Sequence, residues 1–185
     1  MGVNVSVVAI DAGNSKTDVA LIGEDGTVLA TARGGGFQPP AIGVEAAIDV
    51  LAGVLERAVA ELPAPPVLSG HVSACLANAD LPVEEAELAA ALESRGWGSS
   101  VEVRNDTFAI LRAGVDEPRG VAVVCGAGIN CVGMTPDGRT ARFPAIGRIS
   151  GDWGGGSGLA EEALWFAARA EDGRGEASEL ARALP

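Results

Sequence analysis

Positive charge is scarce in this sequence. Its 185 residues contain 13 Lys and Arg against 25 Asp and Glu, so the formal net charge is −12, and Lys16 is the only lysine. Proteins that bind nucleic acid carry a basic face, and no Lys/Arg cluster is present here, so we predict no nucleic-acid partner. An anionic ligand would have to be held by backbone amides, a metal ion or a single placed cation.

Cysteines are few and unpaired. Cys75, Cys125 and Cys131 are odd in number, form no CxxC motif and lie in apolar stretches, which is typical of reduced thiols in a cytoplasmic protein. A metal site at Cys125 and Cys131 is not favoured, because no His or further Cys stands near them. The sequence also lacks a basic N-terminal region before a long apolar run, and no apolar run has membrane-spanning length. We therefore predict neither a signal peptide nor a membrane segment.

Aromatic residues make up only 4% of the chain, while 48% of residues are hydrophobic and 21% are charged, as in globular proteins. Small apolar residues must therefore fill the core, which suits tightly packed α/β layers. Three apolar strands joined by tight turns predict an antiparallel meander. Helices and strands then alternate, in the order βββαβαβα. The predicted strands are 5–10, 17–22, 28–32, 67–76 and 101–103; a loop covers 34–40, and the predicted helices are 44–62, 84–95 and a short one ending near 114.

The opening pattern returns after a linker at 116–120. Predicted strands at 121–125, 129–134 and 139–143 are again separated by a glycine turn and an Asp-Gly turn, which we interpret as weak internal duplication. We therefore divide the chain into a first lobe, residues 1–117, and the beginning of a second, incomplete lobe, residues 118–185. A Gly-rich loop is predicted at 150–158, then one helix from Leu159 and a last helix over 176–183.

The first segment with chemical potential is the turn Asp11–Thr17. It joins a strand to a strand, which argues against a Walker P-loop and against a Rossmann glycine turn. Gly13 lets backbone N–H groups approach a phosphate, Lys16 adds a compact charge, and Asp11 can hold Mg²⁺ through water. An ordinary hairpin turn is the alternative, since these residue types are common in turns. The candidate phosphate-binding residues here are Asp11, Gly13, Asn14, Ser15, Lys16 and Thr17.

Asp106 lies where a strand ends and a short helix begins. One interpretation is that Asp106 is the helix N-cap. The other is that its carboxylate is a general base, which takes the proton of a sugar hydroxyl as that hydroxyl attacks the γ-phosphate of ATP. Ligand sites at the carboxyl ends of strands favour the second interpretation.

Two further glycine segments follow. The turn Gly126-Ala-Gly128 comes after a strand and, paired with the first turn, could clamp a triphosphate from the opposite side. A lone GxG is weak evidence, but its place in the apparent repeat strengthens it. In the segment 150–158, Asp152 could accept hydrogen bonds from sugar hydroxyls and Trp153 could pack on a sugar face. A flexible linker is the alternative for that segment.

These four segments, in this order, resemble the BadF/BadG/BcrA/BcrD ATPase family, and within it the N-acetylglucosamine kinases of the sugar kinase/Hsp70/actin superfamily. The resemblance covers almost the whole chain. It implies an α/β ribonuclease H-like (actin-like ATPase) fold with the active site between two lobes. It also implies transfer of phosphate from Mg²⁺-ATP to a hydroxyl of an amino sugar such as N-acetylglucosamine, with Asp106 as the general base. The sugar-binding residues that it implies are Gln38, Asn105, Asp106, Ala127, Asn130 and Asp152.

The sequence departs from these kinases at several points. Gln38 is nearest in kind to their sugar-binding Asn, and Ala127 stands where they commonly have Thr. Their adenosine-binding segment lies later than residue 185, so we expect weak or no catalysis from these residues alone. Two other functions stay open, namely the activator ATPase of 2-hydroxyacyl-CoA dehydratases, which needs bridging cysteines, and a non-catalytic sugar-sensing module. A homodimer is also compatible with the sequence.

Overall fold

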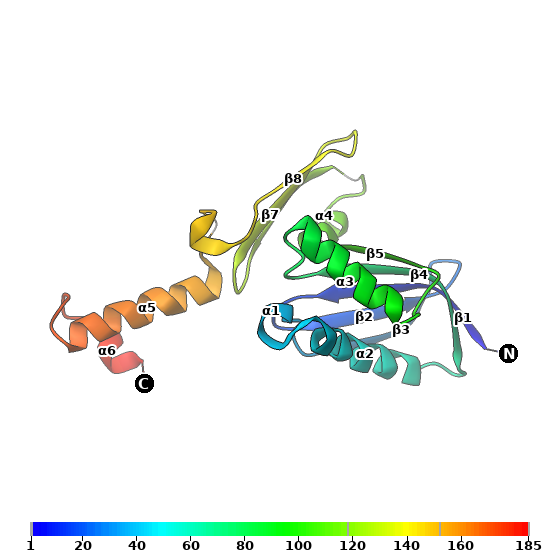
Figure 1. Cartoon of the computed structure of the whole chain (residues 1–185), viewed down its shortest axis with the longest axis horizontal. Coiled ribbons are helices and arrows are strands. Elements are labelled where there is room, and N and C mark those ends of the chain that lie inside the picture. Colours follow the sequence, from blue (N-terminus) through cyan, green and yellow to red (C-terminus); the bar gives the residue numbers. More distant parts are fainter. Residues whose placement is uncertain (1, 118, 152, 185) are drawn as a thin grey trace.

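The computed structural model describes residues 2–117, 119–151 and 153–184. A five-stranded sheet with the order β3-β2-β1-β4-β5 lies at its centre (Figure 1). The predicted antiparallel meander is present as β1 (Val3–Ala12), β2 (Thr17–Ile22) and β3 (Val28–Gly34). The strands β4 (Pro66–Leu76) and β5 (Ser100–Asn105) run parallel to β1. The carboxyl ends of β1, β4 and β5 therefore meet at one edge of the sheet.

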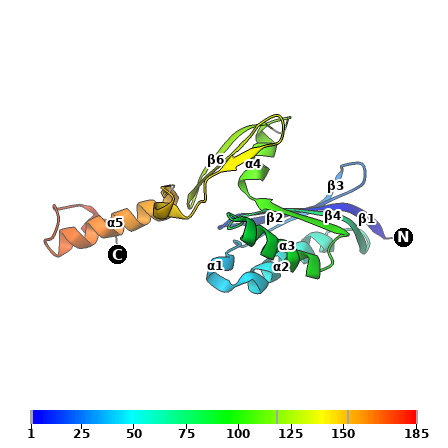
Figure 2. The ribbon, with the colours of Figure 1, turned by 45° about the horizontal axis from the view of Figure 1, so that its top comes forward.

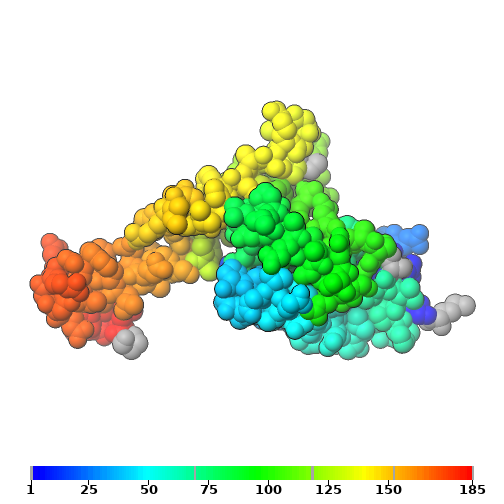
Figure 3. Space-filling model, viewed as in Figure 1, coloured from blue at the N-terminus to red at the C-terminus, as the bar shows by residue number. Residues whose placement is uncertain are grey.

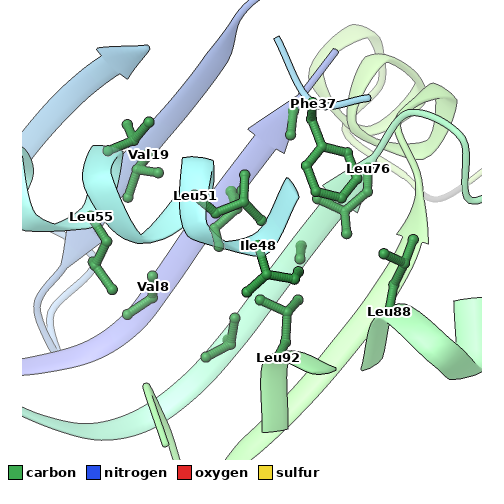
Figure 4. Packing of buried hydrophobic residues seen from close by; sticks show 14 of the residues in the cluster. Val8, Val19, Phe37, Ile48, Leu51, Leu55, Leu76, Leu88 and Leu92 are labelled. Carbon is green, nitrogen blue, oxygen red and sulfur yellow. The ribbon is translucent and has the colours of Figure 1, made fainter. Parts of the chain in front are cut away.

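One face of this sheet is covered by α2 (Val44–Ala60) and α3 (Pro82–Ser94) (Figure 2). The apolar positions of α2 recur at helical spacing and pack on the strands, so Ile48 and Leu51 are 0% exposed. Phe37, from the segment after β3, is equally buried beside them (Figure 4). Full burial of one such side chain stabilises the fold by about 1.5–3 kcal/mol. Most of the buried apolar residues lie between the large sheet and these helices, which is therefore the main core.

A second, smaller sheet follows. It has the order β6-β7-β8, is antiparallel throughout, and consists of β6 (Gly120–Cys125), β7 (Ile129–Met134) and β8 (Thr140–Arg142). The helix α4 (Thr107–Gly114) lies on the side of the large sheet opposite to α2 and α3, next to β6 (Figure 2). Leu111 of α4 packs with Ala122 and Val132 of the small sheet. The division of the chain at residue 117 stays a prediction.

The last part of the chain extends away from both sheets (Figure 3). It comprises the 3₁₀ turn η1 (Gly147–Ile149), α5 (Gly155–Glu171) and α6 (Leu180–Ala183). Four apolar side chains of α5 are between 51% and 72% exposed, namely Leu159, Leu164, Trp165 and Phe166. No helix in the described parts of the chain is long and apolar enough to cross a bilayer.

Several strands and helices differ from the prediction by a few residues at their ends, and three helices differ more. A short helix, α1 (Pro39–Ile42), begins inside the predicted loop 34–40, because proline suits the first positions of a helix. The helix α5 begins at Gly155, inside the predicted loop 150–158. The helix α6 begins at Leu180 and is shorter than the predicted helix 176–183. The Leu180 N–H donates to the Ser178 hydroxyl at 3.2 Å at this start.

Candidate active site

The turn between β1 and β2 presents unpaired backbone amides. The N–H of Gly13 donates to the carbonyl oxygen of Lys16 at 2.8 Å, which closes the turn. Within the described chain, the N–H groups of Asn14, Ser15 and Lys16 donate to no other group, and these residues are exposed. Consecutive free N–H groups in a tight turn form a concave site for an anion. The geometry suits a phosphate, which is the ligand predicted for this turn.

The segment after β3 holds this turn in place. The Phe37 N–H donates to the carbonyl oxygen of Gly13 at 2.9 Å, and the Gln38 side-chain amide donates to the carbonyl oxygen of Asn14 at 2.9 Å. Gly36 packs so closely that an added Cβ would lie 2.0 Å from that same Asn14 oxygen. Gln38 therefore lies beside the predicted phosphate turn and supports it.

Asn78 is a further support that the sequence did not reveal. It follows β4 with a positive φ of 64°, a conformation that asparagine tolerates better than most residues. Its side-chain amide donates to Asn14 Oδ1 at 3.0 Å and to the Phe37 carbonyl oxygen at 3.1 Å. Asn78 thus joins the end of β4 to both sides of the turn.

The remaining residues of the turn, Lys16 and Thr17, differ in exposure. The Lys16 ammonium is 3.8 Å from Asp18 Oδ2 and largely exposed. Thr17 is fully buried, and its hydroxyl has no hydrogen-bond partner among the described residues. Thr17 shares the buried face of β2 with Val19 and Leu21, so its hydroxyl lies away from the exposed amides of the turn.

Carboxylates gather at the edge of the sheet beside this turn. Partial burial raises the pKa of Asp11, and the negative charge of Asp18 raises it further, while Lys16 lowers it. Burial likewise raises the pKa of Asp106, and the charge of Asp11 adds to that shift, while nearby backbone amides offset it in part. Hydrogen bonds from Arg33 hold the pKa of Asp18 below its usual value. Asp11 and Asp106 therefore lie close enough to repel each other.

A divalent cation at this cluster would be held through a single carboxylate. In the described part of the chain, no group of three or more His, Cys, Asp or Glu side chains is arranged to hold a metal. Magnesium commonly keeps several waters and takes one or two carboxylates together with substrate phosphates. Asp11 at the end of β1 agrees with that pattern. A cation there would also offset the repulsion that Asp18 adds at Asp11 and that Asp11 adds at Asp106.

The carboxylate of Asp106 is not used to cap α4. Asp106 occupies the N-cap position, yet its side chain makes no capping hydrogen bond. Asn105 takes that role, because its Oδ1 accepts hydrogen bonds from the Thr107 N–H at 3.0 Å and from the Thr107 hydroxyl at 2.5 Å. The half-buried Asp106 carboxylate is thus left available for chemistry.

A second half-buried carboxylate, Asp80, was not predicted from the sequence. Its Oδ1 accepts hydrogen bonds from the side-chain amides of Asn105 at 2.8 Å and Asn130 at 3.0 Å. Burial raises its pKa to about 6, with added repulsion from Glu84 and Asp106. The available signal was the pair of polar residues Asn78 and Asp80 straight after an apolar strand, the same placement as Asp11 and Asp106.

The second glycine turn packs on the start of α5. The N–H groups of Gly156 and Ser157 donate to the carbonyl oxygens of Gly126 and Ala127, at 2.8 and 2.9 Å. The first amides of α5 are therefore already bonded. By contrast, the N–H groups of Ala127 and Gly128 donate to no group in the described residues and remain free for a ligand.

Two clefts border these residues. A cleft of about 490 Å³ brings Asn14 and Gln38 together with Ala127, Gly128 and Trp153. The two turns predicted to bind the triphosphate thus border the same cleft. A larger cleft of about 1120 Å³ lies against the face of the large sheet that α2 and α3 leave open and includes Asp11, Cys75 and Phe108.

Not every predicted residue joins these clefts. Asn105 and Asn130 are in contact through Asp80, and Asn130 Nδ2 is also 3.3 Å from Asn105 Oδ1. Asp106 lines neither cleft and is linked to the site through Asp11 and Asn105. Asp152 lies outside the described residues, so its predicted role in sugar binding stays a prediction.

The profile of the BadF/BadG/BcrA/BcrD ATPase family matches residues 8–183. The chain belongs to this family. Membership agrees with the arrangement above, in which two glycine turns border one cleft and the free carboxylate of Asp106 lies beside the first turn. The resemblance stated from the sequence is thereby confirmed, and so is the mixed α/β fold of the family's sugar-kinase members.

Individual relatives of this ATPase family member are named as sugar kinases. The chain is 28% identical over 170 residues to an N-acetylmuramic acid/N-acetylglucosamine kinase of Clostridium acetobutylicum, covering 92% of this chain and 56% of the relative. A solved structure of a candidate N-acetylglucosamine kinase from Chromobacterium violaceum superposes with a TM-score of 0.79 at 27% identity, over 97% of this chain and 62% of that one. A candidate N-acetylglucosamine kinase from Porphyromonas gingivalis shares the fold, with a TM-score of 0.64 at 21% identity over 95% of this chain and 60% of that one.

The chain thus spans between half and two thirds of the length of each of these relatives.

Proposed function

We propose that this chain forms the phosphate and sugar ends of an ATP-dependent kinase site that acts on an amino sugar such as N-acetylglucosamine. The observation that carries the proposal is the carboxylate of Asp106. It is half-buried at the carboxyl edge of the sheet, makes no capping hydrogen bond, and interacts with Asp11 beside the first turn. A carboxylate in that position has the properties that a general base needs.

The two turns are proposed to hold the triphosphate of ATP. The free N–H groups of Asn14, Ser15 and Lys16 donate to phosphate oxygens from one side, and those of Ala127 and Gly128 donate from the other. Asp11 would hold Mg²⁺, which would supply positive charge to offset that of the phosphates. In a chain with a net charge of −12, backbone amides bind the anion without adding basic side chains.

Asp106 is proposed to accept the proton of the reacting sugar hydroxyl. As that oxygen forms a bond to the γ-phosphorus, the bond between the γ-phosphorus and the bridging oxygen of ADP breaks, and the hydroxyl proton passes to the carboxylate. Burial and the charge of Asp11 raise the pKa of Asp106, which makes the ionised carboxylate a stronger base.

The sugar is proposed to lie in the cleft shared by Gln38 and Ala127. Asn105, Asn130 and Asp152 are the other proposed sugar-binding residues. The side-chain amides of Asn105 and Asn130 both donate to Asp80, and their oxygens accept from Thr107 and from the Cys131 N–H, so a sugar would contact them only by replacing one of these bonds. The names of the relatives support an N-acetylated hexosamine as the acceptor.

A coupled ADP-release assay tests this function. The full gene product that contains this sequence is assayed with N-acetylglucosamine, N-acetylmuramic acid and glucose, as wild type, Asp106→Asn and the control Asp116→Asn, which changes an exposed residue after α4. We expect an amino sugar to raise ADP release, Asp106→Asn to lower kcat by about 10²–10⁴-fold, and the control to stay close to wild type. If no sugar raises turnover, or if Asp106→Asn retains full activity, the proposal is wrong.

A further inference from the structure

Asp80 lies in the link between β4 and α3, and its backbone is held from both sides. The Ala77 N–H donates to the carbonyl oxygen of Ala12 at 2.7 Å, so the link begins at the edge of the sheet beside the first turn. At the other end, the N–H groups of Asp80 and Leu81 both donate to Glu84 Oε2, at 3.0 and 2.9 Å. The backbone from which the Asp80 carboxylate extends is therefore held in place on both sides.

The Asp80 carboxylate contacts both sheets. Its Oδ1 accepts from Asn105, at the end of β5 in the large sheet, and from Asn130, on β7 of the small sheet. An amide group that donates on one side must present its oxygen on the other. Asn105 Oδ1 consequently accepts from Thr107, and Asn130 Oδ1 accepts from the Cys131 N–H at 2.7 Å. One acceptor atom thus sets the orientation of two side-chain amides.

The two amides lie beside the two parts of the site that must act together. Asn105 and Thr107 flank Asp106 where β5 ends and α4 begins. Asn130 follows the glycine turn that presents the N–H groups of Ala127 and Gly128. Loss of the shared acceptor would leave the two amides joined only by the 3.3 Å contact from Asn130 Nδ2 to Asn105 Oδ1, so the distance between the base and the phosphate turn would be less tightly constrained.

A neighbouring contact joins the same two regions. Arg142 of β8 donates to the Ala79 carbonyl oxygen at 3.0 Å and to Glu85 Oε1 at 2.9 Å. Arg142 secures the small sheet against the link but touches neither Asn105 nor Asn130. The contacts through Asp80 and the 3.3 Å contact from Asn130 to Asn105 are therefore the ones that reach the candidate catalytic residues.

We propose that Asp80 is a positioning residue, whose carboxylate holds the Asp106 segment and the second glycine turn in a fixed relation by accepting hydrogen bonds from Asn105 and Asn130. This inference rests on the proposed kinase function. Asp80 itself does not touch the reacting atoms; it acts through the two asparagines.

Two substitutions separate this role from a general effect on folding. Asp80→Ala removes the acceptor. Asp80→Asn keeps an oxygen that can accept both hydrogen bonds, while its new NH₂ group would relieve the repulsion from Glu84 and Asp106. Asp116→Ala, at an exposed site away from the network, is the matched control for the loss of a carboxylate.

The first readout does not depend on activity. In ¹H–¹⁵N spectra of the chain, the side-chain amide signals of Asn105 and Asn130 should exchange with solvent about tenfold faster in Asp80→Ala, as expected for loss of a hydrogen bond to a carboxylate. Asp80→Asn and Asp116→Ala should leave both signals protected. If Asp80→Ala changes neither signal, or only one, the proposed link is wrong.

The second readout is catalysis by the full gene product. We expect Asp80→Ala to lower kcat by about 10- to 100-fold while the KM for sugar changes little, and Asp80→Asn to restore most of the loss. An Asp80→Asn variant as impaired as Asp80→Ala would overturn the positioning role in favour of a role for the charge. If the wild type shows no sugar turnover, the proposed function fails, and the amide signals alone then decide whether Asp80 holds the two regions together.

Discussion

Replacement of Gly36 by Ala tests how tightly the phosphate turn is packed. A Cβ at this position would lie 2.0 Å from the carbonyl oxygen of Asn14 and 2.7 Å from its carbonyl carbon. Ordinary contact begins at 3.4 Å, so the two segments would have to separate by about 1.4 Å. That movement would break the 2.9 Å hydrogen bond from Gln38 to the same oxygen and displace the free amides of the turn.

The expected cost follows from these contacts. Overpacking of this kind costs about 1–3 kcal/mol, which lowers the melting temperature of a chain of this size by about 3–10 °C. The adjacent Gly35→Ala is a matched control, because a Cβ there would meet nothing within 4 Å. Gly35→Ala should leave stability unchanged or raise it slightly, since it reduces the freedom of the unfolded chain.

Thermal unfolding followed by circular dichroism measures the change in stability. Titration calorimetry with Mg²⁺ and tripolyphosphate measures the change in phosphate affinity, and we expect the Kd of Gly36→Ala to rise about tenfold as the N–H donors of the turn move. A melting temperature of Gly36→Ala equal to that of Gly35→Ala would refute the packing argument. Reduced stability with unchanged polyphosphate affinity would refute the assignment of this turn as the phosphate site.

Three other outcomes are expected. Burial and the charge of Asp11 raise the pKa of Asp106, so its ionised form opposes folding at neutral pH. Asp106→Asn should therefore melt at the same temperature as wild type or higher while losing activity. A large drop in melting temperature would indicate a structural role. The pKa of Asp80 is raised from 3.8 to about 6, so its favourable contribution to folding is present below pH 3.8 and is lost as the pH rises to about 6. The stability of Asp80→Asn relative to wild type should therefore increase between pH 4 and 7, and a decrease over that range would contradict the sign of the shift. Lys16→Met should weaken tripolyphosphate binding in calorimetry with little effect on melting, because the exposed contact with Asp18 contributes little to stability; unchanged affinity would show that the backbone amides suffice.

Much of the fold could be predicted from local patterns. The apolar positions of α2 recur at helical spacing, and the same side chains form the buried layer against the sheet. The beginning of α5 could not be predicted in this way. A Cβ at Gly155 would lie 2.7 Å from each of three carbonyl oxygens of the turn 126–128, so the helix starts there because of a contact with a distant turn. Glycines in the sequence alone indicated a loop.

The candidate site was predicted in part. The turn Asp11–Thr17 and the pair Asn105-Asp106 were identifiable because turn chemistry and the position of a carboxylate after a strand are local features. The sequence could not decide between a cap and a base at Asp106. The structure shows that Asn105 makes the capping hydrogen bonds, which leaves the Asp106 carboxylate free.

The sequence by itself determined the order of strands and helices, the glycine turns and the scarcity of basic side chains, since these depend on residue type and spacing along the chain. Only the tertiary structure decided which polar groups meet. Asn78 reaches Asn14 across 64 positions, and Asp80 reaches Asn105 and Asn130 across 25 and 50. Such contacts depend on β4 lying between β1 and β5, which places the ends of three strands side by side. The strand order, and no local pattern, brings these residues together.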